Sequence, residues 1–340
     1  CIAAHEVYIL CCEKTICRPT RSLLQVVSII FAVMLTMNEA FVIPVSYDVI
    51  LSWRLERRFP NISPATLSGF LVSSCFATIP FGYIGATWFV NEPYRHYRAR
   101  LVVVLSSCVL ISTHFLCAFI LTSSMSGDRQ FMLLLGIRAV QGFATGSGQV
   151  LQTMGIMASS KREFTLMGIA GMTGVVTGYG VGPLITPAVS SGTLHWHSMP
   201  RSQVALAKAS IAMSVLWCVF TLAATLTMPA LELPIPPLDD EESDDKCQQS
   251  DRQLAVDSCS EEVRISTFTS CLLYNCERAF TAMSIEVGSA LILEKQFQWG
   301  FASVGYAGFF MSAMACVGCL MAISVRLTGL LGEVELAYIC

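Results

Sequence analysis

The stretch that decides the fold runs from residue 138 to residue 183. It begins Arg138-Ala-Val-Gln141-Gly142-Phe-Ala-Thr-Gly146-Ser-Gly148 inside an apolar segment, and the polar turn Ser159-Ser-Lys-Arg-Glu163 follows. Glycines spaced by three and four residues share one face of a helix, and in lipid such a smooth face lets two helix backbones approach closely. We therefore assign six residues of this stretch to helix packing and gating. They are Gly142, Gly146, Gly174, Gly178, Gly182 and Pro183.

The composition of the whole chain predicts a membrane protein. Of its 340 residues, 54% are hydrophobic and only 13% are charged, and soluble domains rarely have this balance. The apolar residues form long runs, so we expect an all-α polytopic protein whose surroundings are the lipid bilayer. The membrane part is only mildly basic, and we expect no nucleic-acid partner and a monomer.

The apolar runs divide the chain into membrane spans. A spanning helix needs about 20 mostly apolar residues, and that template fits about eight times. The predicted spans are 23–51, 66–90, 101–123, 131–158, 165–189, 204–230, 267–294 and 300–325. A ninth begins near Leu330, and the chain stops inside it at Cys340. We therefore expect a piece of a longer protein, with its second half truncated.

The polar segments set the domain organisation. Residues 231–265 contain Pro234-Ile-Pro-Pro237 and Asp239-Asp-Glu-Glu-Ser-Asp-Asp245. Such a segment cannot bury a core, so we expect a disordered linker. It separates a first six-helix bundle, residues 23–230, from the start of a second bundle, residues 266–340. The distribution of Lys and Arg favours a cytoplasmic segment 1–22 and a cytoplasmic linker. Asn61-Ile-Ser63 is then a glycosylation sequon on the outer or lumenal side, with an unused sequon as the alternative.

Two motifs in this arrangement resemble a known family. Arg138-x-x-Gln141-Gly142-x-x-x-Gly146-x-Gly148 is similar to the fourth-helix motif of the major facilitator superfamily. Gly174-x-x-x-Gly178-x-x-x-Gly182-Pro183 is similar to the fifth-helix motif of that superfamily. The resemblance implies two helix bundles that rock about a central solute site, with the glycine face of residues 165–189 as the sliding surface. The family's acidic residue four positions after a glycine is missing, because Gly82 is followed by Tyr83-Ile-Gly-Ala86.

Two branches of the superfamily look closest. Phe41-Val-Ile-Pro-Val-Ser-Tyr47 and the segment 277–309 resemble the vacuolar phosphate transporters that carry an SPX domain. The fourth and fifth helices equally resemble the lysosomal relatives linked to neuronal ceroid lipofuscinosis. These resemblances imply a vacuolar or lysosomal membrane, with the plasma membrane as the alternative. The basic residues that the phosphate transporters carry late in the fourth helix are replaced here by Gln149-Val-Leu-Gln152-Thr153.

Charged and polar residues inside the predicted spans are the candidates for solute chemistry. A charge in hydrocarbon is costly, so these residues should face a partner or a watery cavity. We assign Arg138, Gln141, Arg278 and Glu286 to substrate binding; Arg278 and Glu286 are eight residues apart and share a helix face. Glu39 is assigned to proton coupling, because a desolvated carboxylate can bind a proton reversibly. The alternative for Glu39 is a structural ion pair with Arg138.

The function that follows is secondary active transport of a small solute, such as the anion phosphate, by alternating access and with proton coupling. An anion channel on the same scaffold and a non-transporting receptor or scaffold are the alternatives. The sequence contains no nucleophile–base arrangement, P-loop or dinucleotide motif, so we expect no enzymatic activity and no cofactor. Cys316-Val-Gly-Cys319 has metal-ligand spacing but no second ligand pair, and we expect no metal site.

Overall fold

The computed structural model describes residues 18–55, 58–90, 95–152, 164–190, 199–227, 285 and 287–327. Within these ranges the chain is helical apart from short turns and contains no strand. The helices are α2 (Arg18–Ala40), α3 (Ile43–Trp53), α4 (Pro64–Val90), α5 (Arg95–Thr122), α6 (Gly127–Gly148), α8 (Phe164–Ser190), α9 (Arg201–Thr227) and α11 (Phe301–Leu327). A further helical stretch covers residues 287–297, and we call it the 287–297 helix. The all-α class predicted from the composition is confirmed.

Six segments of the described chain are long and apolar enough to cross a membrane. They are Leu23–Trp53, Pro64–Phe89, Leu101–Thr122, Leu166–Ser190, Arg201–Leu226 and Phe301–Met321. These segments agree with six of the eight predicted spans and make the chain an integral, multi-pass membrane protein. Helix α6, from the fourth predicted span, is not among them, because Arg138, Gln141 and its glycines lower its hydropathy. Most of the predicted span 267–294 lies outside the described residues.

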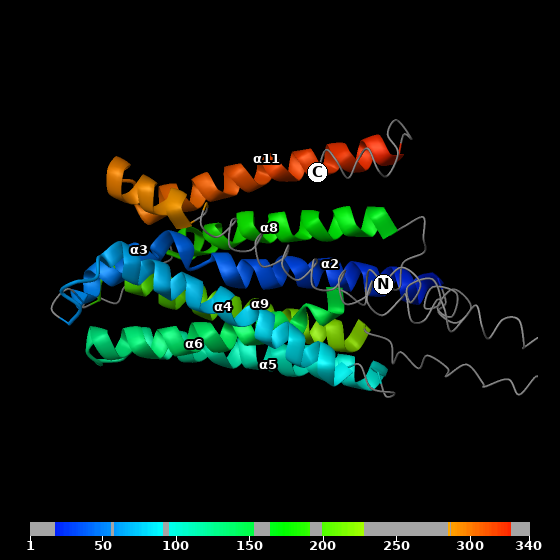
Figure 1. The fold of residues 1–340 in the computed structure, drawn as a ribbon, viewed down its shortest axis with the longest axis horizontal. Helices are drawn as coiled ribbons and strands as arrows, with labels where there is room; N and C mark the ends of the chain where they lie inside the picture. The colour runs from blue at the N-terminus through cyan, green and yellow to red at the C-terminus, as the bar shows by residue number, and fades with distance from the viewer. Residues whose placement is uncertain are drawn as a thin grey trace, which may run out of the picture.

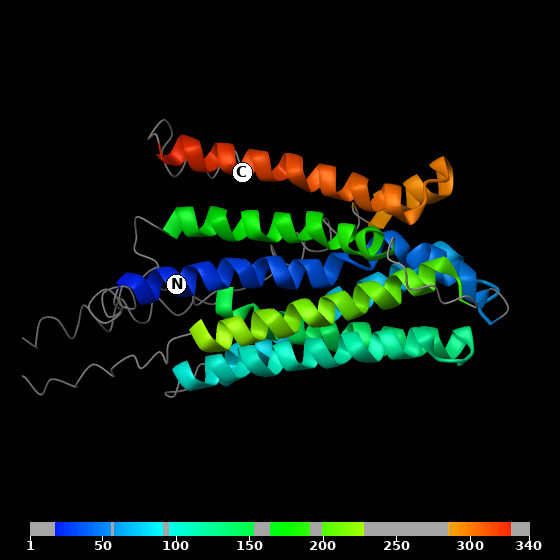
Figure 2. The ribbon, with the colours of Figure 1, turned by 180° about the vertical axis from the view of Figure 1, so that it is seen from behind.

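The helices lie side by side along one long axis (Figure 1). From α4 to α9, successive helices run in alternating directions. Helix α11 lies at one edge of the bundle, and α8 lies between α11 and α2, whereas α5 and α6 lie at the opposite edge; the reverse view in Figure 2 shows the same order. Helix α8 therefore contacts α2, which precedes the acidic linker 231–265 in the sequence, and α11, which follows it.

The first predicted span is two helices rather than one. Helix α2 ends at Ala40, residues 41 and 42 form a turn, and α3 begins at Ile43. Pro44 lies in the first turn of α3. Proline has no N–H for the helix ladder, and its ring collides with the carbonyl four residues earlier. The sequence thus places a helix break in the middle of a segment that crosses the membrane.

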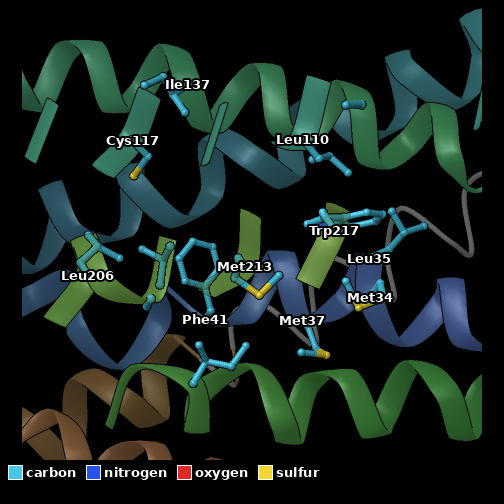
Figure 3. Packing of buried hydrophobic residues seen from close by; sticks show 14 of the residues in the cluster. Met34, Leu35, Met37, Phe41, Leu110, Cys117, Ile137, Leu206, Met213 and Trp217 are labelled. Atoms are coloured by element: carbon cyan, nitrogen blue, oxygen red, sulfur yellow. The ribbon is translucent and has the colours of Figure 1, made fainter. Parts of the chain in front are cut away.

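The apolar core fills the space between α2, α5, α6 and α9. Figure 3 shows its centre, where Leu35, Leu110 and Trp217 come together from α2, α5 and α9. The Trp217 indole meets the Phe31 ring edge-on, with 5.7 Å between ring centroids. In lipid the attraction between helices comes from such close packing rather than from exclusion of water. Large apolar side chains on the outer faces, such as Phe119, Leu226 and Phe310, are exposed, as expected of surfaces that meet lipid.

Candidate functional site

Six polar side chains meet within this core. They are Asn38 and Glu39 from α2, His114 from α5, and Arg138, Gln141 and Thr145 from α6, and we call them the Arg138 cluster. All six are buried, and only 2% of the surface of Arg138 is exposed. Ionisable groups at such a depth are costly unless every polar atom finds a partner. Their hydrogen bonds therefore decide what the cluster can do.

Arg138 binds the end of α2 rather than an open site. Its Nη1 donates to the main-chain oxygen of Asn38 at 3.0 Å, and its Nη2 donates to the main-chain oxygen of Glu39 at 3.0 Å. Nη1 also donates to Oε1 of Gln141 at 2.8 Å. The guanidinium thus joins two carbonyl groups of one helix to an amide of another.

The helix break explains why Arg138 is needed there. The last carbonyl groups of a helix have no intrahelical partner, and no lipid group can hydrogen-bond to them inside the membrane. Asn38 and Glu39 are in the last turn of α2, where a positive charge also interacts favourably with the helix dipole. Thr186 of α8 donates to the main-chain oxygen of Phe41 in the turn, at 2.9 Å. Side chains of α6 and α8 therefore satisfy the backbone that Pro44 interrupts.

The other members of the cluster join α2, α5 and α6. Asn38 Nδ2 donates to the Thr145 hydroxyl at 3.0 Å, and Gln141 Nε2 lies 3.5 Å from Nδ1 of His114. Three buried atoms of the cluster have no hydrogen-bond partner within the described part of the chain. These atoms are Asn38 Oδ1, His114 Nε2 and Arg138 Nε. They retain capacity to bond a polar group that enters the cluster.

Glu39 connects the cluster to α8. Its carboxylate oxygen Oε2 accepts a hydrogen bond of 2.7 Å from the hydroxyl of Tyr179. The Phe41 ring lies 5.6 Å from the Arg138 guanidinium and 5.3 Å from the His114 ring. The carboxylate of Glu39 is therefore held by α8, while its main-chain oxygen is held by α6.

Tyr179 also lines a pocket. The pocket lies between α3, α8, the 287–297 helix and α11, and its cavity volume is about 80 Å³. Its described lining consists of Ile43, Pro44, Tyr179, Pro183, Ser289, Ala290, Leu293, Val304, Ala307, Gly308, Met311 and Ser312. None of these residues is charged, and their hydroxyl groups come from Tyr179, Ser289 and Ser312. Ligand pockets are usually apolar with a few polar groups of this kind.

Two carboxyl groups also approach each other between α3 and the 287–297 helix. Glu294 is buried, and its carboxyl group interacts electrostatically with Asp48 of α3. Asp48 itself is half-buried rather than fully solvated. This pair could not be predicted from the sequence, because the two residues lie on opposite sides of the linker 231–265.

The predicted glycine packing is present between α4 and α6. A Cβ on Gly142 would overlap the main-chain oxygen of Cys75, and a Cβ on Gly146 would overlap that of Ile79. Gly82 of α4 meets the main-chain oxygen of Phe143 in the same way. Thr78 adds a hydrogen bond across the contact, to the main-chain oxygen of Ala139 at 2.6 Å. Only glycine fits at these positions, because each would otherwise collide with a backbone atom.

Three glycines of α8, Gly174, Gly178 and Gly182, pack against α2. A Cβ on Gly178 would overlap the Thr36 hydroxyl, and one on Gly182 would lie 3.1 Å from the main-chain oxygen of Met37. Gly174 is similarly close to Ile29, at 3.1 Å from its main-chain oxygen. The glycine face is thus packed within the helices that precede the acidic segment.

A different face of α8 meets α11. A Cβ on Gly305 of α11 would lie 2.7 Å from the main-chain oxygen of Pro183. The Thr177 hydroxyl lies 3.4 Å from Sγ of Cys316 on α11. The sliding surface expected at Gly174, Gly178 and Gly182 therefore does not face α11. The surface between the two halves of the sequence carries Pro183 instead.

The structure brings together part of the predicted site. Arg138, Gln141 and Glu39 are in one cluster, whereas Arg278 and Glu286 lie outside the described residues. Asn61 is exposed in the turn between α3 and α4, as a glycan acceptor must be. Tyr179, which follows Gly178 directly, was not predicted as a site residue. A phenol inside an apolar span was the available signal, since its hydroxyl needs a partner there.

Comparison with known proteins adds no assignment: no protein-family model matches the sequence, and no curated protein is significantly similar to it.

Proposed function

We propose that this protein is a secondary active carrier of a small solute, built as a member of the major facilitator superfamily. The observation that carries the proposal is the pocket between α3, α8, the 287–297 helix and α11, whose wall includes Tyr179. Its walls come from segments before and after the acidic linker. In such carriers the solute site lies between two bundles that rock about it.

Alternating access would require α8 and α11 to separate. Their contact includes close approaches at small groups, with Gly305 against Pro183 and Gly180 against Ser312. Small residues allow close approach without deeply interlocked side chains. This contact therefore suits a surface that opens and closes.

Proton coupling would pass through Glu39 and Tyr179. The Tyr179 hydroxyl donates to the Glu39 carboxylate at 2.7 Å, and the same side chain lines the pocket. A solute that reaches Tyr179 would change this hydrogen bond, and with it the tendency of Glu39 to bind a proton. Solute binding and proton binding would then influence each other, as linkage requires.

The contacts of Arg138 and Gln141 favour a positioning role over direct contact with solute. The guanidinium is bonded to Asn38, Glu39 and Gln141, and neither Arg138 nor Gln141 is among the described residues that line the pocket. A vacuolar or lysosomal membrane remains the proposed location, on the resemblance of the two family branches.

The test uses cysteines placed in the pocket wall, because it needs no knowledge of the solute. The full chain carrying Ser312→Cys is reconstituted in vesicles, and a membrane-impermeant methanethiosulfonate reagent is applied from either side. Labelling of residue 312 is read by peptide mass mapping. In a carrier, residue 312 should be labelled from both sides of the membrane. Conditions that raise the labelling rate from one side should lower the labelling rate from the other.

A disulfide lock provides the decisive comparison. Because the Thr177 hydroxyl lies 3.4 Å from Sγ of Cys316, Thr177→Cys should form a disulfide with the native Cys316 on oxidation. The locked protein should be labelled from one side only, and a reductant should restore labelling from the other. Thr177→Cys combined with Cys316→Ser is the matched control. Labelling from both sides in the locked state would indicate a channel. Labelling from one side only in the unlocked protein would indicate a non-transporting protein. Either result overturns the proposal.

A further inference from the structure

We propose that the pocket between α8 and α11 binds a neutral, mostly apolar small molecule that carries a hydroxyl or carbonyl group, and not an inorganic anion. This inference rests on the proposed function and names the substrate class of its solute site. It follows from the chemistry of the wall, the position of the hydroxyl groups, the contacts of the buried Arg138 and the space available.

The wall offers apolar contact from all four helices around the pocket, including Pro183 of α8. Ile43 comes from α3, Leu293 from the 287–297 helix, and Val304 and Met311 from α11. Removing apolar surface of a solute from water against such a wall contributes about 25 cal/mol per Å². Met311 is a flexible side chain that adapts to irregular shapes. The main attraction of the pocket is therefore for carbon groups.

The polar groups of the wall are hydroxyls. Tyr179 is fixed in position by its hydrogen bond to the carboxylate of Glu39. Ser289 and Ser312 are half-buried on the 287–297 helix and on α11. Hydroxyl groups both donate and accept, so they suit an alcohol or a carbonyl and carry no charge to balance a phosphate.

Arg138, the buried cation of the core, does not line the described wall of this pocket. A desolvated anion requires charge-assisted hydrogen bonds to make up for its lost hydration. The Arg138 guanidinium is bonded to two carbonyl groups of α2 and to Gln141, and it is not among the described lining residues. An anion bound at the described wall would therefore be left without a counter-charge.

The space is that of a small organic molecule. The cavity volume is about 80 Å³, whereas a single water needs roughly 10–15 Å³ by the same measure. Gly308 forms part of the wall, and a Cβ there would lie 3.5 Å from Cγ of Pro183, an ordinary contact. A larger side chain at residue 308 can thus enter the pocket without striking the backbone.

The experiment is photolabelling of the full chain in lipid nanodiscs with 4-azidobenzyl alcohol, a neutral ring with one hydroxyl. Labelled residues are located by peptide mass mapping. We expect labelled residues on α8, α11 or the 287–297 helix. Excess benzyl alcohol should reduce this labelling at least fivefold, and excess inorganic phosphate should leave it unchanged. Gly308→Leu should remove at least four-fifths of this labelling. Gly318→Leu is the matched control, because residue 318 is on the same helix with open space around it.

Each outcome bears on one proposal. Competition by phosphate, labelling that ignores Gly308→Leu, or equal loss in Gly318→Leu overturns the neutral-solute inference, even if cysteine accessibility shows alternating access. Specific labelling without alternating access supports the binding site and overturns the carrier. The two proposals therefore fail separately.

Discussion

Arg138 Nη2 of α6 donates a hydrogen bond of 3.0 Å to the main-chain oxygen of Glu39, one residue before the end of α2. A charged side chain thus completes the backbone of a broken helix inside the membrane. The sequence suggested an ion pair between the side chains of these two residues as one role. In the structure the guanidinium binds the main chain of Glu39, and the carboxylate accepts a hydrogen bond from Tyr179.

Arg138→Lys should destabilise the protein. A lysine ammonium cannot reproduce the planar fork that reaches two carbonyl groups and Gln141, and a buried group left without a partner costs about 1–3 kcal/mol. We expect a lower temperature of unfolding, measured by loss of the monodisperse peak of the detergent-solubilised full chain. Arg129→Lys is the control, because Arg129 is exposed at the start of the same helix. Equal thermal stability of the two variants would contradict the capping role.

Pro44→Ala should make Arg138 less important. Alanine restores an N–H at residue 44 and removes the ring that collides with the Ala40 carbonyl, so α2 and α3 can continue as one helix. The carbonyl groups of Asn38 and Glu39 would then find partners within the helix. In a double-mutant cycle, Arg138→Lys should cost at least ~0.5 kcal/mol less in the Pro44→Ala background. Strict additivity of the two substitutions would show that the break and the cap are independent.

Gly142→Ala should separate α4 from α6. Its Cβ would overlap the main-chain oxygen of Cys75, and forcing extra volume into a packed contact costs about 1–3 kcal/mol. Gly136→Ala is the control on the same helix, since nothing lies within 4 Å of a Cβ there. That variant should be neutral or more stable, because alanine favours helix by up to about 1 kcal/mol over glycine. The thermal stability of both variants decides the point, and a Gly142→Ala protein as stable as the parent would refute it.

The spans and the close-packing glycines could be predicted because each depends on local features of the sequence. Apolar runs of about 20 residues mark helices that cross lipid, and the spacing of Gly142 and Gly146 places them on one face. The partner of each face could not be predicted, because the sequence does not encode which helix lies opposite. Gly174, Gly178 and Gly182 of α8 face α2, whereas a neighbouring face with Gly180 and Pro183 meets α11.

The role of Arg138 was only half predictable. Its sequence position showed that it must face inwards. Its partners, however, are main-chain carbonyl groups, which every residue has and which become available only where a helix breaks. Pro44 was visible in the sequence, but the predicted span 23–51 ran through it as one helix. The break and the cap could be recognised only together, once α2 and α6 were side by side.

Glu39→Gln should remove the effect of pH on access to the pocket. With Ser312→Cys as the reporter, the ratio of labelling from the two sides should change with pH in the parent and remain constant in Glu39→Gln, since glutamine cannot bind the proton. Asp128→Asn is the control, because Asp128 lies in the first turn of α6, away from the Arg138 cluster. A pH response that persists in Glu39→Gln would exclude Glu39 as the coupling group.

Asn61→Gln should abolish a glycan if the α3–α4 turn faces the lumen. Asn61 is exposed, and the substitution leaves Ser63 in place. Ser63 must be kept, because its hydroxyl accepts from the N–H of Thr66 at 3.1 Å and caps the start of α4. We expect expressed protein to shift on gels after endoglycosidase treatment, and Asn61→Gln to migrate at the shifted position without the enzyme. A parent protein that does not shift would argue against the lumenal assignment.

The dependence of α2 on Arg138 also constrains how the chain is made. About a hundred residues separate the carbonyl groups of the broken helix from the side chain that satisfies them, so the ribosome must synthesise α4, α5 and most of α6 before the first segment is complete. Helix α6 in turn is among the less apolar helices and needs α2 to shelter its charge. The first segment alone leaves carbonyl groups without partners in lipid, and α6 alone carries a charge into it. The insertion machinery must therefore keep the first segment close until the fourth arrives, and nascent chains that end before residue 138 should stay bound to it.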